Sequence, residues 1–283
     1  MSEHASWRTL PGRVARNRAA VAGAAFVLLF LLVAVLAPWL APYDPGAQAL
    51  DSGLSGPSLA HWLGQDRLGR DLLSRLVYGA RISVAVGLGT VSLSLLIGFL
   101  VGSASGFFGG KVDHVLMRLA DVLLAFPGIL LAIAITSVLG PSLRNVLIAL
   151  CAIGWVGYAR LIRGQILKVK EMEFVQSATA VGSPPARLLL VHILPNAISP
   201  VIVEATFGIA RAIVAEAGLS FLGLGVSPPT PSWGAMINEG RHFLFVAPHL
   251  TTVPGLAIMA TVMAFNFLGD GLRDAMDVRE EIR

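Results

Sequence analysis

Long runs of hydrophobic residues, separated by short polar segments, dominate the pattern of this chain. A helix needs about 20 mainly apolar residues to cross the hydrocarbon core of a bilayer. Six stretches approach or exceed that length, and we expect transmembrane helices over residues 19–39, 82–106, 115–140, 145–163, 197–217 and 250–269. The pattern therefore predicts an all-α membrane protein with six transmembrane helices.

The third and fifth spans are not uniformly apolar. In the third, Pro127-Gly128 predicts a kink, because proline interrupts the backbone hydrogen bonds of a helix. The fifth contains Glu204, Arg211 and Glu216, and a charge at the bilayer centre costs at least about 2.5–3.5 kcal/mol. Two interpretations stay open. Either Arg211 and Glu216 pair with each other or with a partner subunit, or all three residues line a translocation path.

The segment before the second span has a helical pattern of its own. Its apolar residues recur every four positions, at Leu68, Leu72, Leu76 and Ala80. This spacing predicts an amphipathic helix on the outer membrane surface. Asp66 is the expected N-cap of that helix, since a carboxylate accepts hydrogen bonds from the first free amides.

Composition supports the membrane assignment. The chain is 55% hydrophobic and 13% charged, whereas soluble domains carry about 25% charged residues. Disorder and an ordinary soluble enzyme are therefore excluded. The single cysteine, Cys151, allows no disulfide, and the histidines show no metal-ligand spacing, so we expect no metal site and no cofactor. The modest net charge of +4 indicates membrane orientation, not a nucleic-acid partner.

The first apolar run reads as an uncleaved anchor. It is too long for a signal peptide, and Pro38 directly after Ala37 would block cleavage. With six spans, about two thirds of the 21 Lys and Arg residues lie on one side, which is then the cytoplasmic side. We therefore expect both termini in the cytoplasm, a cytoplasmic N-terminal segment over residues 1–18, a permease domain over 19–283 and an extracytoplasmic loop over 40–81.

Motifs for catalysis are absent from the sequence. Residues 105–112 come nearest to a phosphate-binding P-loop, but they lack its first glycine and carry Val112 where a magnesium-binding Ser or Thr belongs. The sequence contains neither HExxH nor GxSxG. We therefore expect a chain that is not an enzyme and has no catalytic residues.

The most informative segment is the cytoplasmic loop at residues 168–196. Glu173 and the apolar residues that follow it have helical spacing, and Gly182 is a natural C-cap. Ser183 and Pro184 suit the N-cap and first position of a second helix, which continues to Pro195. Such a helix–turn–helix either caps the bundle passively or passes motion between a cytoplasmic partner and the spans.

This loop resembles the EAA loop of ABC importer permeases. Gly182 and Leu194-Pro195 match its spacing, although Gln176 and Ser177 replace the first two residues of the Glu-Ala-Ala signature and His192 replaces an apolar residue. Four further segments resemble dipeptide, oligopeptide and nickel permeases: residues 64–71, 219–225, 228–234 and 266–274.

The resemblance implies a membrane subunit of an ATP-driven importer in the bacterial inner membrane, with the type I importer permease fold. It implies a second homologous permease, two separate ATPase subunits that hydrolyse ATP, and an extracytoplasmic binding protein. The implied ATPase-coupling residues are Glu173, Phe174, Gln176, Ala178, Gly182, Leu194 and Pro195, of which Leu194-Pro195 sets the angle into the fifth span.

The loop at residues 218–249 is rich in Pro and Gly and lies on the outer side. We predict that Trp233, Asn238 and Arg241 contact the binding protein there. The alternative is a half-buried loop that braces the bundle. As solute we expect a dipeptide or oligopeptide, with a nickel complex as the alternative. A secondary transporter is a more distant possibility, because the chain shows no internal repeat.

Overall fold

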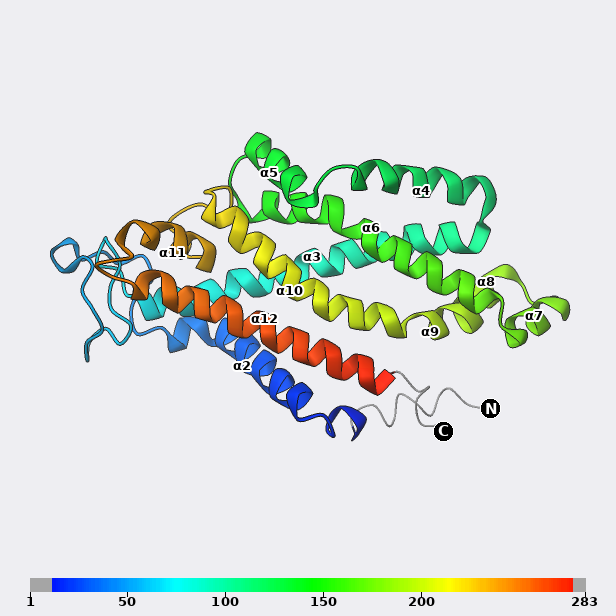
Figure 1. Cartoon of the computed structure of the whole chain (residues 1–283), viewed down its shortest axis with the longest axis horizontal. Helices are drawn as coiled ribbons and strands as arrows, with labels where there is room; N and C mark the ends of the chain where they lie inside the picture. Colours follow the sequence, from blue (N-terminus) through cyan, green and yellow to red (C-terminus); the bar gives the residue numbers. More distant parts are fainter. Residues whose placement is uncertain (1–11, 277–283) are drawn as a thin grey trace.

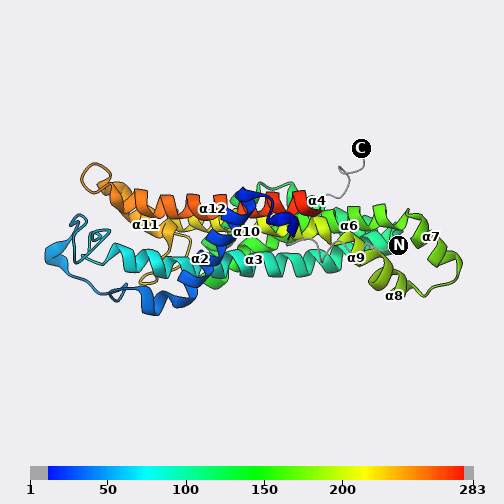
Figure 2. The ribbon, with the colours of Figure 1, turned by 90° about the horizontal axis from the view of Figure 1, so that it is seen from below.

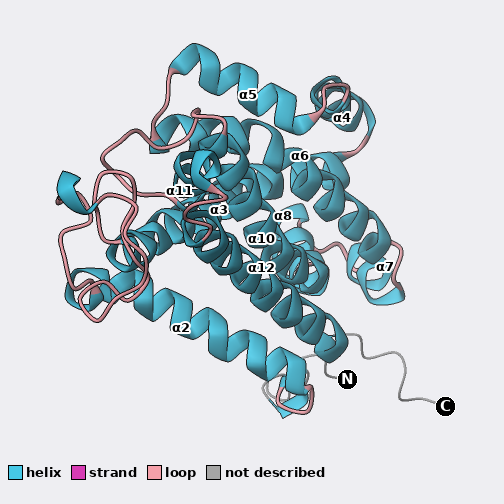
Figure 3. Cartoon of the chain, turned by 60° about the vertical axis from the view of Figure 1, so that its left-hand side comes forward, coloured by secondary structure: helices cyan, strands magenta, loops and turns pink. Residues whose placement is uncertain are grey.

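A computed structural model describes residues 12–276 of the chain. These residues are mostly helical and contain no strand (Figure 3). The main helices are α2 (Arg18–Leu40), α3 (Leu72–Phe108), α4 (Gly110–Leu124), α5 (Gly128–Leu139), α6 (Leu143–Lys170), α7 (Glu173–Ala180), α8 (Pro185–Arg187), α9 (Leu194–Ala197), α10 (Ser199–Phe221), α11 (Trp233–Gly240) and α12 (His249–Met276). A π-helical stretch, Leu188–Ile193, joins α8 to α9.

The helices form an elongated bundle. Helices α3, α6, α10 and α12 run along its long axis, and α2 packs beside α12 and α3 (Figures 1 and 2). Helices α7 to α9 lie at one end, called here the α7 end. Helix α11 and the loop at residues 41–71 lie at the other, called the α11 end.

Four helices are long and apolar enough to cross a membrane: α2, α3, α6 and α12. Two bent pairs meet the same test together. Helices α4 and α5 meet at 81°, and the helix Pro185–Ala197 meets α10 at 55°. The described residues therefore hold four candidate spans, or up to six if each bent pair is one span. The bend between α4 and α5 confirms the kink expected at Pro127.

Small residues bring α3 and α6 into close contact. A Cβ atom at Gly98 would lie 2.6 Å from the Cβ of Tyr158, and one at Gly102 would lie 2.5 Å from the carbonyl oxygen of Ala159. Close backbone approach through small residues is typical of helix packing in lipid. This contact holds α3, the longest helix of the described residues, against α6.

The separate surface helix expected around residues 67–81 is not present. Leu72 and Ala80 belong to α3 and are buried in the core, so this part of the chain continues directly into the long helix. The N-cap is Asp71, whose carboxylate accepts from the backbone amide of Ser74, and not Asp66. Packing against the bundle takes the side chains of Leu72 and Ala80 out of water, which stabilises the continuous helix.

Candidate functional site

The α7 end forms the predicted helix–turn–helix. Within α7 only Val175 is buried, and it packs in one cluster with Val169, Ile193 and Leu194. Phe174, one of the residues predicted to contact an ATPase, is 42% exposed. Helix α7 therefore has a single apolar anchor and keeps its other faces free.

The turn after α7 matches the prediction. Gly182 has φ +83°, and the amide of Ser183 donates to the carbonyl oxygen of Ala178 at 3.1 Å. A Cβ at Gly182 would meet no atom within 4 Å, so the backbone angle, not space, requires glycine here. The next helix begins one residue later than expected, because Pro184 is its N-cap and Pro185 its first residue.

The bend that leads into α10 differs from the prediction. Leu194 and Pro195 lie inside α9, and the break falls at Ile198, just before Pro200 in the first turn of α10. Proline lacks an amide hydrogen and disfavours helical backbone in the residue before it, which favours a break just before Pro200. Leu194 instead anchors α9 in the cluster that holds Val175.

Polar contacts fasten the base of this unit to the bundle. The Lys170 amine, at the end of α6, donates to the carbonyl oxygens of Gly106 and Phe107 at 3.4 and 2.9 Å. Arg163 on α6 makes a bidentate ion pair with the carboxylate of Asp113 on α4, at 2.5 and 2.6 Å. The same carboxylate accepts a hydrogen bond from the Ser105 hydroxyl. Helices α3, α4 and α6 are therefore tied together directly beside α7.

The charged residues of α10 lie on different faces of the helix. Arg211 forms an ion pair with Glu204, and their side chains are 61% and 39% exposed. Residues seven apart lie on one face of a helix, two turns from each other. Glu216 is fully buried and accepts from the Ser220 hydroxyl at 2.6 Å.

This arrangement corrects two expectations. Arg211 does not pair with Glu216 within the chain, because residues five apart point about 140° away from each other around a helix. Glu216 also does not line an open path among the described residues, because its side chain is buried in the C-terminal half of α10. Glu204 and Arg211 remain accessible.

Two open cavities border the exposed pair. One of about 400 Å³ is lined by Thr90, Ser94, Tyr158, Gly208 and Arg211 among others, between α3, α5, α6 and α10. The other, of about 360 Å³, is lined by residues that include Glu204, Phe207 and Arg273. The ion pair therefore joins the walls of two cavities that α6 and α10 share.

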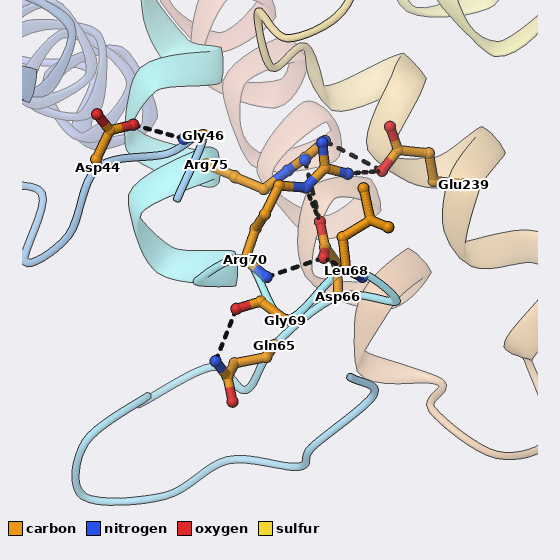
Figure 4. A network of polar contacts seen from close by, with 9 residues as sticks. All are labelled: Asp44, Gly46, Gln65, Asp66, Leu68, Gly69, Arg70, Arg75 and Glu239. Atoms are coloured by element: carbon orange, nitrogen blue, oxygen red, sulfur yellow. Dashed lines mark hydrogen bonds and ion pairs between the residues drawn. The ribbon is translucent and has the colours of Figure 1, made fainter. Parts of the chain in front are cut away.

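The α11 end contains a buried ionic network that was not predicted from the sequence (Figure 4). Arg70 contacts Asp66 at 2.6 Å and Glu239 at 2.6 Å, and Arg75 contacts the same two carboxylates at 3.0 and 3.1 Å. Both arginines are buried. Buried charges need close partners of opposite sign. The run of Asp and Arg at residues 66–75 was therefore the sequence feature that could have indicated an ionic network. Its remaining member, Glu239, is too distant in sequence for a local pattern to include it.

The three residues predicted to contact a binding protein differ in their burial. Trp233 is buried, its indole Nε1 donates to the carbonyl oxygen of Leu76 at 2.9 Å, and its ring packs on Phe30. Trp233 therefore braces the bundle and is not a docking contact. Asn238 is half-buried, and Arg241 is exposed with its guanidinium over the ring of Phe221.

Exposed apolar side chains gather at the same end. Trp62 and Leu59 in the first loop are 70% and 98% exposed, and Phe245 and Val246 after α11 are also largely exposed. Apolar side chains free of the core at this end mark a surface suited to a protein partner.

Comparisons with known proteins agree on one family. Residues 94–281 match the family described as Binding-protein-dependent transport system inner membrane component, and residues 6–57 match the N-terminal TM domain of oligopeptide transport permease C. The chain is 48% identical over 275 residues to the glutathione transport system permease protein GsiD of Escherichia coli O6:K15:H31 (strain 536), which covers 97% of this chain and 89% of that protein. It is 45% identical over 272 residues to GsiD of Pectobacterium atrosepticum, which covers 96% and 90%.

Solved structures share the fold at low sequence identity. The MetNI methionine ABC transporter in inward facing conformations matches with a TM-score of 0.58 and 18% identity, over 71% of this chain and 96% of that one. An amino acid ABC transporter with histidines matches with a TM-score of 0.58 and 14% identity, over 70% and 92%. These likenesses confirm the predicted fold class.

Proposed function

The chain belongs to the family of binding-protein-dependent transport system inner membrane components, and we propose that its solutes are short peptides of the glutathione type. It is a membrane-spanning permease subunit of an ABC importer. The proposal of a peptide solute rests on 48% identity to permease proteins of a glutathione transport system. A short peptide carries free carboxylates, which suit the accessible positive charge of Arg211.

The coupling role rests on one observation, the exposed helix α7 fastened at its base. Glu173, Phe174 and Gln176 are exposed, Ala178 is half-buried, and Gly182 makes the rigid turn that follows. A helix with one buried anchor offers its free faces to a partner, while the contacts of Lys170 pass its movement to α3 and α6. We assign the ATPase contact to these residues.

The remaining parts of the importer follow the family pattern. Two separate ATPase subunits hydrolyse ATP beneath α7, and a second homologous permease completes the pathway. The α7 end is cytoplasmic in this proposal, because the basic residues Arg160, Arg163, Lys168 and Lys170 lie toward it. The binding protein then docks at the α11 end, on Arg241 and the exposed apolar residues around it.

The experiment is reconstitution of the native complex in lipid vesicles. The tagged chain is purified from its native host in mild detergent, and its partners are identified by mass spectrometry. We expect a second permease, two ATPases and uptake of radiolabelled glutathione that needs both ATP and the binding protein, with a non-hydrolysable ATP analogue as the control. A partner-free chain that transports without ATP would overturn the assignment.

A further inference from the structure

The cavity beside Arg211 contains hydroxyl groups that the protein leaves without a partner. The side-chain oxygens of Thr90, Ser94 and Tyr158 are buried in its wall, and none has a hydrogen-bond partner among the described residues. Each of these residues is at least nine-tenths buried. Buried polar groups are normally satisfied, so three unsatisfied hydroxyls around one cavity indicate that something polar occupies it.

Gly208 leaves the space that one of these hydroxyls, that of Tyr158, occupies. A Cβ atom at Gly208 would lie only 2.1 Å from the Tyr158 hydroxyl oxygen, so the missing side chain makes room for that oxygen. Gly208 and Arg211 stand three residues apart on α10 and line the same cavity. Helical neighbours at this spacing share a face, which places the hydroxyl and the guanidinium on one wall.

Glu204, the ionic partner of Arg211, borders a cavity that is also lined by a second cationic residue. Arg273 on α12 lines the cavity that Glu204 borders. A carboxylate that leaves Arg211 would therefore still face a positive charge. The ion pair can open without stranding either charge, provided that another anion replaces Glu204 at Arg211.

We propose that this cavity is a subsite for a carboxylate of the transported solute. The solute carboxylate replaces Glu204 as the partner of Arg211 and accepts a hydrogen bond from Tyr158, while Glu204 turns toward Arg273. Ser94 and Thr90 face the polar remainder of the solute. The inference rests on the proposed import of short peptides and assigns their recognition to named residues of the permease.

A helix of the second permease would fit the same cavity less well. Packing apolar side chains there would leave three hydroxyls without partners in a dry interface, and each unsatisfied buried group is unfavourable. A hydrated peptide supplies both acceptors and donors. The charge and the hydroxyls therefore favour a solute over a packed helix.

The first test compares the two halves of the ion pair. Arg211→Gln and Glu204→Gln break the same bond, but only the first removes the proposed solute contact. In the reconstituted complex, at saturating glutathione-loaded binding protein, we expect Arg211→Gln to lower the uptake rate at least about 10-fold and Glu204→Gln to keep at least about half of it. Arg211→Lys should keep an intermediate rate, and Arg144→Gln, an exposed arginine at a different cavity, is the matched control.

Equal losses in the two glutamine variants would overturn the proposal, because a pair that only braces α10 predicts that result. So would a loss of the second permease from either purified complex, which would make the pair a subunit contact. Absence of glutathione uptake by the wild-type complex would instead contradict the proposed function itself.

The second test removes a hydroxyl that has no partner within the described chain. Tyr158→Phe should leave thermal stability unchanged or raised, since no hydrogen bond is lost. It should nevertheless lower glutathione uptake about 3- to 10-fold if the hydroxyl contacts the solute. Tyr78→Phe, whose ring instead lies near the guanidinium of Arg81, serves as the control. Normal uptake by Tyr158→Phe would remove this hydroxyl from the subsite and contradict the proposal.

Discussion

The amine of Lys170 lies 2.9 Å from the carbonyl oxygen of Phe107, so the last residue of α6 holds the penultimate residue of α3. Helix α7 begins three residues later. Its one buried side chain, Val175, packs against the same end of α6. In the proposed coupling role, a displacement of α7 by an ATPase would therefore reach α3 and α6 through this short connection.

Replacing Lys170 with methionine should break this connection and keep most of the side chain's apolar bulk. Hydrogen bonds from a charged donor stabilise by roughly 1.5–3 kcal/mol, so we expect a modest fall in melting temperature. We expect a larger fall in ATP-driven uptake at unchanged abundance. Lys168→Met, at an exposed position on the same helix, is the control. Equal uptake by both variants would show that the Lys170 contact does not transmit motion.

A β-branched residue at Gly182 should uncouple transport without removing the protein from the membrane. The φ of +83° lies in the left-handed region, which costs a non-glycine residue roughly 1–2 kcal/mol and a β-branched residue more. Gly182→Val should therefore displace the turn and lower uptake while ATPase subunits still bind. Gly164→Val is the matched control, because Gly164 is helical and has no atom near its missing side chain. Normal transport by Gly182→Val would contradict the proposed coupling role of α7 and its turn.

Gly208→Ala should destabilise the bundle through one identified clash. The new methyl group would overlap the Tyr158 hydroxyl oxygen, and overpacking of a core costs roughly 1–3 kcal/mol. Tyr158→Phe in the same chain removes that oxygen, and the next ring atom stands 3.4 Å away. Thermal unfolding of the two single variants and the double variant should therefore show a strong positive coupling. Additive losses would show that the clash is relieved elsewhere.

Arg75→Met should be among the most damaging single changes at the α11 end. Removing one member of a buried ionic network leaves Asp66 and Glu239 short of positive charge, and such losses reach roughly 3–5 kcal/mol. We expect a marked fall in melting temperature and weaker binding of the binding protein to the complex. Arg81→Met, at an exposed position on the same helix, should cost far less. Similar melting temperatures for the two variants would contradict a structural role for the network.

Local features of the chain were predictable because they depend on nearby residues. Pro127 lies at the bend between α4 and α5 and cannot donate a helical hydrogen bond, and Gly182 adopts a positive φ without a steric penalty. The separate helix expected at the membrane surface failed for a different reason. Its four-residue spacing was correct, but only the packed bundle showed that Leu72 and Ala80 are core residues of α3.

The candidate site was predictable only in part. Glu204 and Arg211 stood out as charges in an apolar span, yet their pairing with each other required the helical register and the surrounding cavities. Trp233 seemed an exposed residue of a loop rich in proline. In the fold, its indole lies where Gly79 leaves space for it, and a Cβ there would come within 2.7 Å of the ring.

The sequence by itself determined the membrane class, the helix-rich fold and the helix–turn–helix at the α7 end, because hydrophobic length and turn chemistry act over a few residues. The tertiary structure decided which charges meet. Glu239 joins Arg70 and Arg75 across more than 160 positions of the chain, and Arg211, Tyr158 and Ser94 share one cavity although they come from three helices. Such contacts depend on how distant helices pack, and packing places side chains that no local pattern connects.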